Sequence, residues 1–388
     1  MKAGGRAGRP GAGCATSASV SDPVIDPAPL FQSLTMGRGR TAPNRLAVAP
    51  MTNLQSDAAG LLTEVEIEWL ARRAEGGFGL IETAAAYVNL DGKGWAGQVG
   101  IDRDACVPGL ARMANRLRVG GGLGVVQLFH GGVRAPSKVT GQQPWSASEF
   151  QEAGKSFEVP RPASDDDLAR VIDDFAAAAV RAERAGFEGV EIHGAHGYLP
   201  SQFLSAAMNQ RTDGWGGDLS GRARLLRTIT QRVRAAVGGS TLVGVRLSPE
   251  DFGYARGLDL DDSLQVAAWL VADGIDFLHL SLWDVTQPTR KRPEAHPTAL
   301  FRAAVGPTVP ILVAGAVWSP AEALACLDRG ADMVALGRAA ILNPAWPDQA
   351  RHPGWQPARP PMSVDDLAAR AVSAQFAEYL RRWPGLVA

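Results

Sequence analysis

Two histidines in a glycine-hinged turn are the residues of this sequence best suited to chemistry. His193 and His196 stand three residues apart, directly after a short apolar run, and Tyr198 follows them. Gly194 and Gly197 hinge the turn. Two imidazoles held in this way can direct N–H groups at one oxygen, which a reaction needs when it builds negative charge on a carbonyl or nitro group. The pattern therefore favours the rim of a reactive pocket.

A metal site and a purely structural role are the alternatives for the same pair. Zinc pairs of the metalloprotease type lie on a helix with a glutamate beside the first histidine, whereas Gly194 follows His193 here. No complete metal-ligand pattern surrounds the turn, so we expect no metal. Structural histidines remain an alternative, but the hinges and Tyr198 favour function.

Arg246 and Gln127 lie inside or near the ends of other apolar runs. A charge such as Arg246 is costly there unless an anion partners it. The anion could be a reduced flavin, negative over N1 and O2, or a carboxylate such as Glu191. The Gln127 amide can both donate and accept, as the pyrimidine edge of a flavin requires.

Glycines follow the last two apolar runs, at Gly315 and at Gly337-Arg338. Phosphate sites in barrels recur in these two loops, where backbone N–H groups near a short helix bind the anion. Arg338 would add a charge-assisted contact. We favour a phosphate site over glycines that only turn the chain.

The elements that must position these residues alternate along the chain. Eight apolar runs predict strands at 45–49, 79–83, 123–129, 188–192, 241–247, 275–281, 309–314 and 332–336. Helical spacing lies between them, for example at 64–76, 107–118, 166–186, 220–236, 261–273 and 320–329. Eight such repeats predict an α/β fold, a single (β/α)8 TIM barrel. An open doubly wound sheet is the alternative, but the first strand lacks the Gly-x-Gly-x-x-Gly turn that such a fold uses.

The sequence also predicts two long loops, an N-terminal tail and a C-terminal helix in addition to the barrel. The long connections 130–164 and 194–218 are expected to cover the active-site face. Residues 1–28 lack periodicity and predict a flexible tail, so the barrel domain, with its C-terminal helix, would span 29–388. The stretch 363–383 predicts one amphipathic C-terminal helix after a proline-rich linker.

Composition limits the partners. The net charge is −1 without a basic stripe, so nucleic acid is not expected. The three cysteines are far apart and form no metal or disulfide pattern, which fits a cytoplasmic protein. No apolar run approaches the ~20 residues of a membrane span.

The motifs, in their order along the chain, resemble those of the old yellow enzyme family of FMN-dependent ene-reductases, also called NADH:flavin oxidoreductases. The resemblance covers roughly 30–350. It is carried by Asn44-Arg45, Ala49-Pro50-Met51-Thr52, the run from Arg73 to Ile81, Gln127 to Gly132, His193 to Tyr198, Asn209 to Gly217, Arg246, Gly315 and Gly337-Arg338.

This resemblance implies NAD(P)H-driven, ping-pong reduction of activated C=C bonds in α,β-unsaturated carbonyl or nitro compounds, with bound FMN and with NADPH or NADH as reductant. It implies a flavin site made of Ala49, Pro50, Met51, Thr52, Ala85, Gln127 and Arg246, with the phosphate at Gly315, Gly337 and Arg338. His193 and His196 would bind the substrate oxygen, and Tyr198 would donate the proton.

Some positions depart from the family pattern. Thr52 stands where one branch has cysteine, and Leu54 where some relatives place a substrate-facing tyrosine. A homodimer or homotetramer is implied, with Arg381 or Arg382 as candidates to reach a neighbouring site. The alternative functions are an FMN-binding flavin reductase or redox sensor, a sugar-phosphate barrel enzyme, and an iron–sulfur relative, which the cysteine count opposes.

Overall fold

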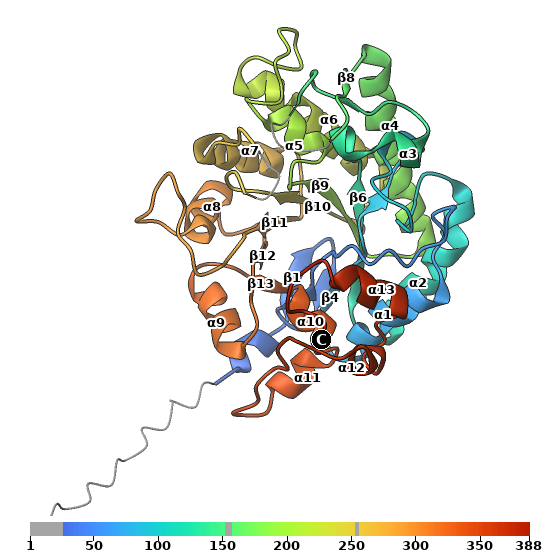
Figure 1. The fold of residues 1–388 in the computed structure, drawn as a ribbon. Helices are drawn as coiled ribbons and strands as arrows, with labels where there is room; N and C mark the ends of the chain where they lie inside the picture. Colours follow the sequence, from blue (N-terminus) through green and yellow to red (C-terminus); the bar gives the residue numbers. More distant parts are fainter. Residues whose placement is uncertain (1–25, 152–156, 253–255) are drawn as a thin grey trace, which may run out of the picture.

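Eight parallel strands form a closed barrel in the computed structural model, which describes residues 26–151, 157–252 and 256–388 (Figure 1). The strands are, in chain order, β3 (Leu46–Val48), β4 (Leu80–Glu82), β6 (Leu123–Phe129), β9 (Gly189–Gly194), β10 (Leu242–Leu247), β11 (Phe277–Ser281), β12 (Ile311–Ala314) and β13 (Met333–Leu336). Neighbours in the chain pair in parallel, and β13 pairs with β3 to close the ring. The predicted (β/α)8 barrel is confirmed, and the open sheet is excluded.

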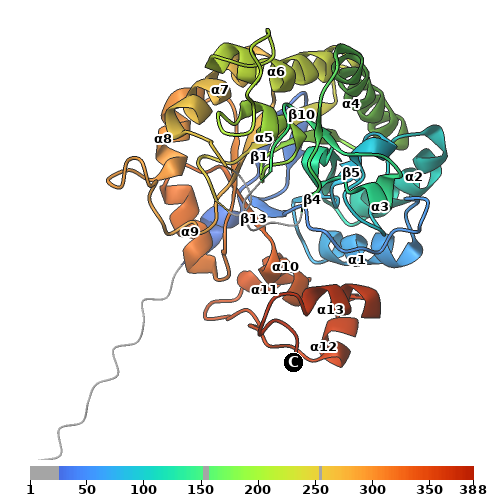
Figure 2. The ribbon, with the colours of Figure 1, turned by 45° about the horizontal axis from the view of Figure 1, so that its top comes forward.

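Helices surround the barrel as an outer ring (Figure 2). They are α1 (Glu64–Glu75), α2 (Val107–Val119), α4 (Asp165–Ala185), α6 (Leu219–Ala236), α7 (Leu260–Ala272), α8 (Pro297–Val305), α9 (Pro320–Asp328), α10 (Arg338–Leu342) and α11 (Trp346–Ala350). Capping boxes start two of them: the Ser319 and Glu322 box fits the cap that the sequence predicts there, and the Ser164 and Asp167 box was not predicted. The sequence analysis did not identify α8, which the His296 side chain caps.

The two long connections carry short elements of their own over the carboxyl ends of the strands. These are the 3-10 helix Gly132–Arg134, α3 (Ser137–Thr140), β7 (Trp145–Ser146), β8 (Arg161–Pro162) and α5 (Leu199–Leu204). The chain between β4 and α2 adds β5 (Ala86–Tyr87), which pairs with β6, and the 3-10 helices Leu90–Gly92 and Asp104–Cys106.

A hairpin that the sequence analysis did not predict closes the amino-terminal end of the barrel. It consists of the antiparallel strands β1 (Leu34–Gly37) and β2 (Arg40–Ala42). Its side chains join an apolar cluster that fills this end of the barrel and includes Leu34, Met36, Ala42, Leu80, Val125, Leu242, Phe277, Leu312 and Met333. The barrel is therefore a packed core at one end, which leaves the other end for a site.

The predicted single C-terminal helix is wrong. Two helices stand there instead, α12 (Val364–Ala368) and α13 (Ala374–Leu380). Ala371 between them has a φ of 59°, which a continuous helix cannot contain, and Ser373 caps the second helix by accepting from the Phe376 N–H. The buried Arg73 of α1 donates to the Arg370 carbonyl, which the break leaves free.

The described chain begins just before a short helix at its N-terminal end, and two of its cysteines are buried. The predicted tail falls almost wholly outside the described residues, and the 3-10 helix Ala28–Phe31 opens the fold. Cys106 and Cys326 are buried free thiols. Among the described residues, no helix is long and apolar enough to cross a membrane.

Candidate active site

A cavity of about 360 Å³ lies at the carboxyl ends of the barrel strands. It brings together nine residues that the sequence analysis proposed: Ala49, Pro50, Met51, Thr52, His196, Arg246, Gly315, Gly337 and Arg338. The four others are not among the lining residues of this cavity, and their contacts place them in neighbouring layers: His193, Tyr198, Ala85 and Gln127. The volume lies in the range of small-molecule and cofactor sites.

The histidine turn forms one edge of the cavity. The rings of His193 and His196 have centroids 5.0 Å apart, and the His193 ring lies 4.9 Å from that of Tyr198. Tyr198 packs edge-on against Phe129 at 4.5 Å, in a cluster with Ala85. The sequence motif therefore brings the rings of His193, His196 and Tyr198 together in one group.

His196 adopts a left-handed backbone with a φ of 60°, which is uncommon for a residue with a side chain. Three contacts hold it there. Its N–H donates to Ser248 Oγ at 3.1 Å, its carbonyl accepts from Arg134 Nη1 at 2.7 Å, and its ring Nε2 lies 2.6 Å from Ser281 Oγ. Backbone strain of this kind costs about 1–3 kcal/mol and persists where surrounding contacts determine it, often in active sites.

Both imidazoles are neutral at physiological pH. Burial is the main cause that places the pKa of His193 and of His196 well below 6.5, and the positive charges of Arg246 and His279 add to it. The Ala195 N–H donates to Nδ1 of His193 at 3.3 Å, so the hydrogen of this ring belongs on Nε2. His193 is therefore a neutral N–H donor.

Arg246 is buried beside the same histidines. Its Nη2 donates to Ser281 Oγ at 3.1 Å. Its Nε has no hydrogen-bond partner in the described part of the chain. An unsatisfied buried guanidinium N–H is costly, and an acceptor on a bound cofactor would satisfy it. The alternative partner considered from sequence, Glu191, instead bonds Gln127 and His279.

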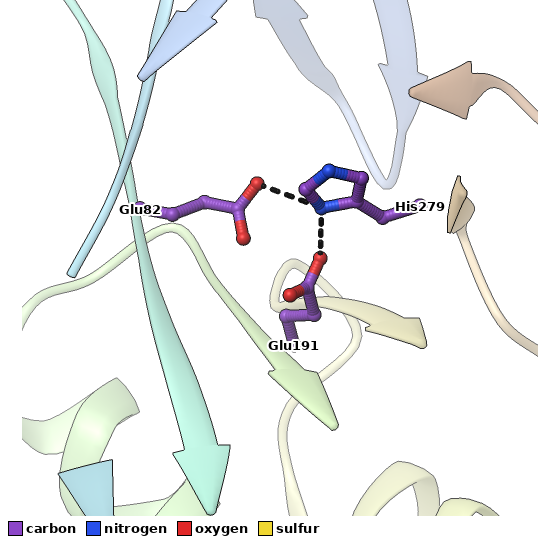
Figure 3. Close-up of side chains that lie close together, drawn as sticks. All are labelled: Glu82, Glu191 and His279. Carbon is purple, nitrogen blue, oxygen red and sulfur yellow. Dashed lines mark hydrogen bonds and ion pairs between the residues drawn. The ribbon is translucent and has the colours of Figure 1, made fainter. Parts of the chain in front are cut away.

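A buried acidic network, made of Glu82, Glu191 and His279, lies inside the barrel next to this layer (Figure 3). His279 Nδ1 lies 2.7 Å from Glu191 Oε2 and 3.2 Å from Glu82 Oε1. Glu191 Oε1 accepts from Gln127 Nε2 at 2.7 Å. The sequence analysis missed Glu82 and His279, although each is a polar residue inside an apolar run, the signal that identified Arg246.

The two glycines of the predicted phosphate loops lie close to the cavity for different reasons. A Cβ on Gly315 would come within 2.7 Å of the Leu282 carbonyl, so only glycine fits there. A Cβ on Gly337 would meet only Met51 Sδ, at 3.6 Å, so its open side faces space rather than packed atoms. Together with the unsatisfied N–H of Arg246, these positions fit a flavin and its phosphate.

The C-terminal segment supplies a wall of the cavity that the sequence analysis missed. Its contributions are Tyr379, Leu380, Trp383 and Leu386. Arg381 pairs with Glu378 at 3.2 Å, and the Arg382 guanidinium lies 5.0 Å from the Tyr379 ring centroid. The segment thus lines the cavity of its own chain, while the predicted reach to a neighbouring site stays a prediction.

A closed (β/α)8 barrel with a strand-end cavity, buried imidazoles and glycine-lined loops suits a barrel enzyme that holds a cofactor at its strand ends. The comparisons with known proteins agree. The model of the NADH:flavin oxidoreductase / NADH oxidase family matches residues 29–353, and the chain belongs to this family, the family of old yellow enzyme.

Individual relatives align with more than four fifths of this chain. A probable NADH-dependent flavin oxidoreductase of Bacillus subtilis, YqiG, is 37% identical over 325 residues, covering 82% of this chain and 86% of that protein. The NADH:fumarate oxidoreductase of Klebsiella pneumoniae is 34% identical over 82% of this chain but only 35% of its own length. The solved structure of the old yellow enzyme homologue from Zymomonas mobilis matches with a TM-score of 0.77 and 31% identity, over 87% of this chain and 96% of that one.

Proposed function

We propose that this oxidoreductase uses FMN and NAD(P)H to reduce activated C=C bonds in α,β-unsaturated carbonyl or nitro compounds. The observation that carries the proposal is the pair of neutral imidazoles, with ring centroids 5.0 Å apart at the edge of the cavity and with Tyr198 beside them. A protein that only bound a flavin would have no use for this group.

The cavity residues would hold the cofactor in two parts. Ala49, Pro50, Met51, Thr52 and Arg246 would contact the ring system, with Ala85 and Gln127 on its pyrimidine side. Gly315, Gly337 and Arg338 would hold the phosphate. When bound, FMN supplies hydride transfer between NAD(P)H and the alkene. The Nε–H of Arg246 would find its acceptor on the ring, close to where negative charge develops.

The imidazoles and the tyrosine would handle the charge on the substrate. Hydride addition to an activated alkene builds negative charge on its carbonyl or nitro oxygen, and neutral N–H donors at His193 and His196 would stabilise it. Tyr198 would then give its phenol proton to the neighbouring carbon. The Phe129 ring, with its centroid 4.5 Å from that of Tyr198, fixes the position of the Tyr198 ring from one side.

The names of relatives support this substrate class. The Klebsiella pneumoniae relative is named for NADH and fumarate, and the double bond of fumarate is conjugated to carboxyl groups. The alternative function, a flavin reductase or redox sensor without alkene turnover, needs the same cofactor but no proton donor over it.

Anaerobic stopped-flow absorbance tests the proposal. The purified protein should be yellow, bleach with NADPH or NADH, and regain colour with 2-cyclohexenone. A His193→Ala/His196→Ala double variant should keep its colour but recover at least about 10²-fold more slowly with the enone, the usual loss for one oxyanion donor. His196→Asn is the matched control, because asparagine tolerates the left-handed backbone and retains a donor.

Other outcomes separate the alternatives. A yellow protein that bleaches but ignores every activated alkene would be a flavin reductase or sensor. A colourless protein that takes up no added FMN would overturn the proposal.

A further inference from the structure

The buried acidic network of Glu82, Glu191 and His279 occupies the layer between the apolar plug and the candidate site. Glu191 lies two residues before His193 on β9, a step of about 7 Å along a strand. His279 pairs in register with Arg246, and Glu191 with Gln127. The network therefore contacts, or lies one layer below, the residues that would hold the flavin pyrimidine ring.

The buried polar atoms of this network have too few hydrogen-bond partners to offset their removal from water. All three side chains have 0% exposure to solvent. Neither oxygen of Glu82 has a hydrogen-bond partner among the described residues, and the same holds for His279 Nε2. Glu82 Oε1 lies 3.2 Å from His279 Nδ1, farther than the 2.7 Å that separates this nitrogen from Glu191 Oε2. A lone carboxylate in this environment is costly, and adding a proton to Glu82 removes that cost.

A proton suits this spacing better than a metal ion. The three ligand atoms lie within 4.8 Å of one another, so a cation is the first alternative to consider. Two ligands at about 2.0–2.2 Å from a tetrahedral metal are roughly 3.3 Å apart. The 2.7 Å from His279 Nδ1 to Glu191 Oε2 is instead the length of a charge-assisted hydrogen bond.

We propose that Glu82, Glu191 and His279 form a proton-holding site, in which Glu82 gains one proton from solvent when the flavin above it is reduced. This inference rests on the proposed binding of FMN. The two electrons come from NAD(P)H as hydride, and the additional proton goes from solvent to the Glu82 carboxylate. Glu82 returns that proton when the alkene accepts the hydride. The barrel interior thereby offsets the negative charge that arises beside Arg246.

The electrostatics of the groups facing Glu82 agree with this role. Burial, and then the negative charge of Glu191, raise the pKa of Glu82 to about 7. Burial alone would lower the pKa of His279, but Glu191 and Glu82 raise it above its usual value. Burial alone would raise the pKa of Glu191, but His279 and Arg246 hold it low. Glu82 is therefore the member placed to gain or lose a proton near neutral pH.

Potentiometric titration of the FMN-loaded protein tests the inference without relying on turnover. Each proton taken up with a two-electron reduction changes the midpoint potential by 29.6 mV for a tenfold change in proton concentration. Above pH 7, wild type should show a slope of two protons, about 59 mV, and Glu82→Gln a slope of one, about 30 mV. Glu188→Gln is the matched control, because Glu188 is a buried glutamate next to β9 at the other end of the barrel, bonded to the Gly124 N–H.

A second measurement covers the case in which Glu82→Gln folds poorly. Infrared spectra of the wild-type apoprotein should show a protonated carboxyl band that disappears as the pH rises through about 7. Equal slopes in wild type and Glu82→Gln would overturn the inference while leaving a yellow, active enzyme. So would a stoichiometric divalent metal that co-purifies with wild type and is lost in Glu82→Gln. A colourless protein, by contrast, would count against the proposed function itself.

Discussion

Single buried residues give this barrel its chemical character. Barrel interiors are usually filled by branched apolar side chains. Here the apolar filling stops at the amino-terminal end, and the layers above it hold Glu82, Glu191, His279, Arg246 and His193. Groups of this kind persist in a low-dielectric interior only when they are paired, neutral or satisfied by a ligand. Burial is the largest cause of the pKa shifts of Glu82, His193 and His196, and the site depends on the neutral forms that these shifts favour.

Glu82 should make the stability of the apoprotein depend on pH. Its pKa in the fold, about 7, lies above the usual 4.5 that an unfolded chain retains, so the fold binds the proton more tightly. The contribution of Glu82 to stability is then greatest below pH 4.5, falls as the pH rises to about 7, and is level above that. The full difference corresponds to about 3 kcal/mol. Glu82→Gln should therefore match wild type near pH 4.5 and exceed it in urea unfolding at pH 8.

The Glu188→Gln variant is the control for that experiment, because no comparable network surrounds Glu188 among its described contacts. A wild-type protein as stable as Glu82→Gln at pH 8 would show that folding does not raise the pKa of Glu82.

At the scale of elements, one arginine joins the C-terminal segment to the barrel. Arg73 of α1 is fully buried and donates to the carbonyls of Trp69, Ala340, Ile341 and Arg370. Two of these carbonyls, those of Ala340 and Ile341, belong to α10, which begins at Arg338 directly after Gly337. The Arg370 carbonyl lies at the break before α13. The same side chain thus positions the predicted phosphate loop and the wall that carries Trp383.

Replacing Arg73 should loosen both regions at once. Arg73→Leu removes the side-chain donor from the carbonyls of Ala340, Ile341 and Arg370, at about 1–3 kcal/mol for each that water does not reach. We expect a loss of at least about 3 kcal/mol in urea unfolding, together with weaker FMN retention on gel filtration. Arg112→Leu is the matched control, because Arg112 forms an exposed pair with Glu64 and should change stability by less than about 1 kcal/mol. An Arg73→Leu protein as stable as this control would contradict the assignment.

At the scale of the whole molecule, the cavity joins segments far apart in the sequence. Met51, Arg246, Gly315, Arg338 and Trp383 all line it. A ligand that fills the cavity therefore bridges the first barrel strand, the last strands and the C-terminal segment. Binding to the folded state alone stabilises it by about 2.7 kcal/mol at a ligand concentration 100 times Kd.

A comparison of FMN with riboflavin, which lacks the phosphate, should show whether the Gly315, Gly337 and Arg338 loops bind the phosphate. FMN should raise the Tm of the apoprotein more than riboflavin does at equal concentration, because only FMN reaches the Gly315, Gly337 and Arg338 loops. Arg338→Ala should shrink the FMN effect toward that of riboflavin and leave the riboflavin effect unchanged. Thermal unfolding followed by fluorescence measures all four combinations. Equal shifts for FMN and riboflavin in wild type would place the phosphate elsewhere.

Local signals in the sequence determined the number, order and kind of the barrel elements. Eight apolar runs and the cap at Ser319 act over a few neighbouring residues, and the strands formed where the runs predict, as did the helices expected between them, whereas α8 was not identified. The glycine-hinged turn of His193 and His196 is local in the same way. These features need no knowledge of distant partners.

Only the tertiary structure decided which interior residues meet. Glu82, Glu191 and His279 come from three strands, and closure of the barrel brings them together at the same level. At the break at Ala371, the Arg370 carbonyl accepts a hydrogen bond from Arg73, almost 300 residues away in the chain. The hairpin of β1 and β2 has only a few apolar residues and is ordered by the barrel end that it plugs. Such contacts have no local signal, because their free energy arises only when the closed barrel removes these groups from water.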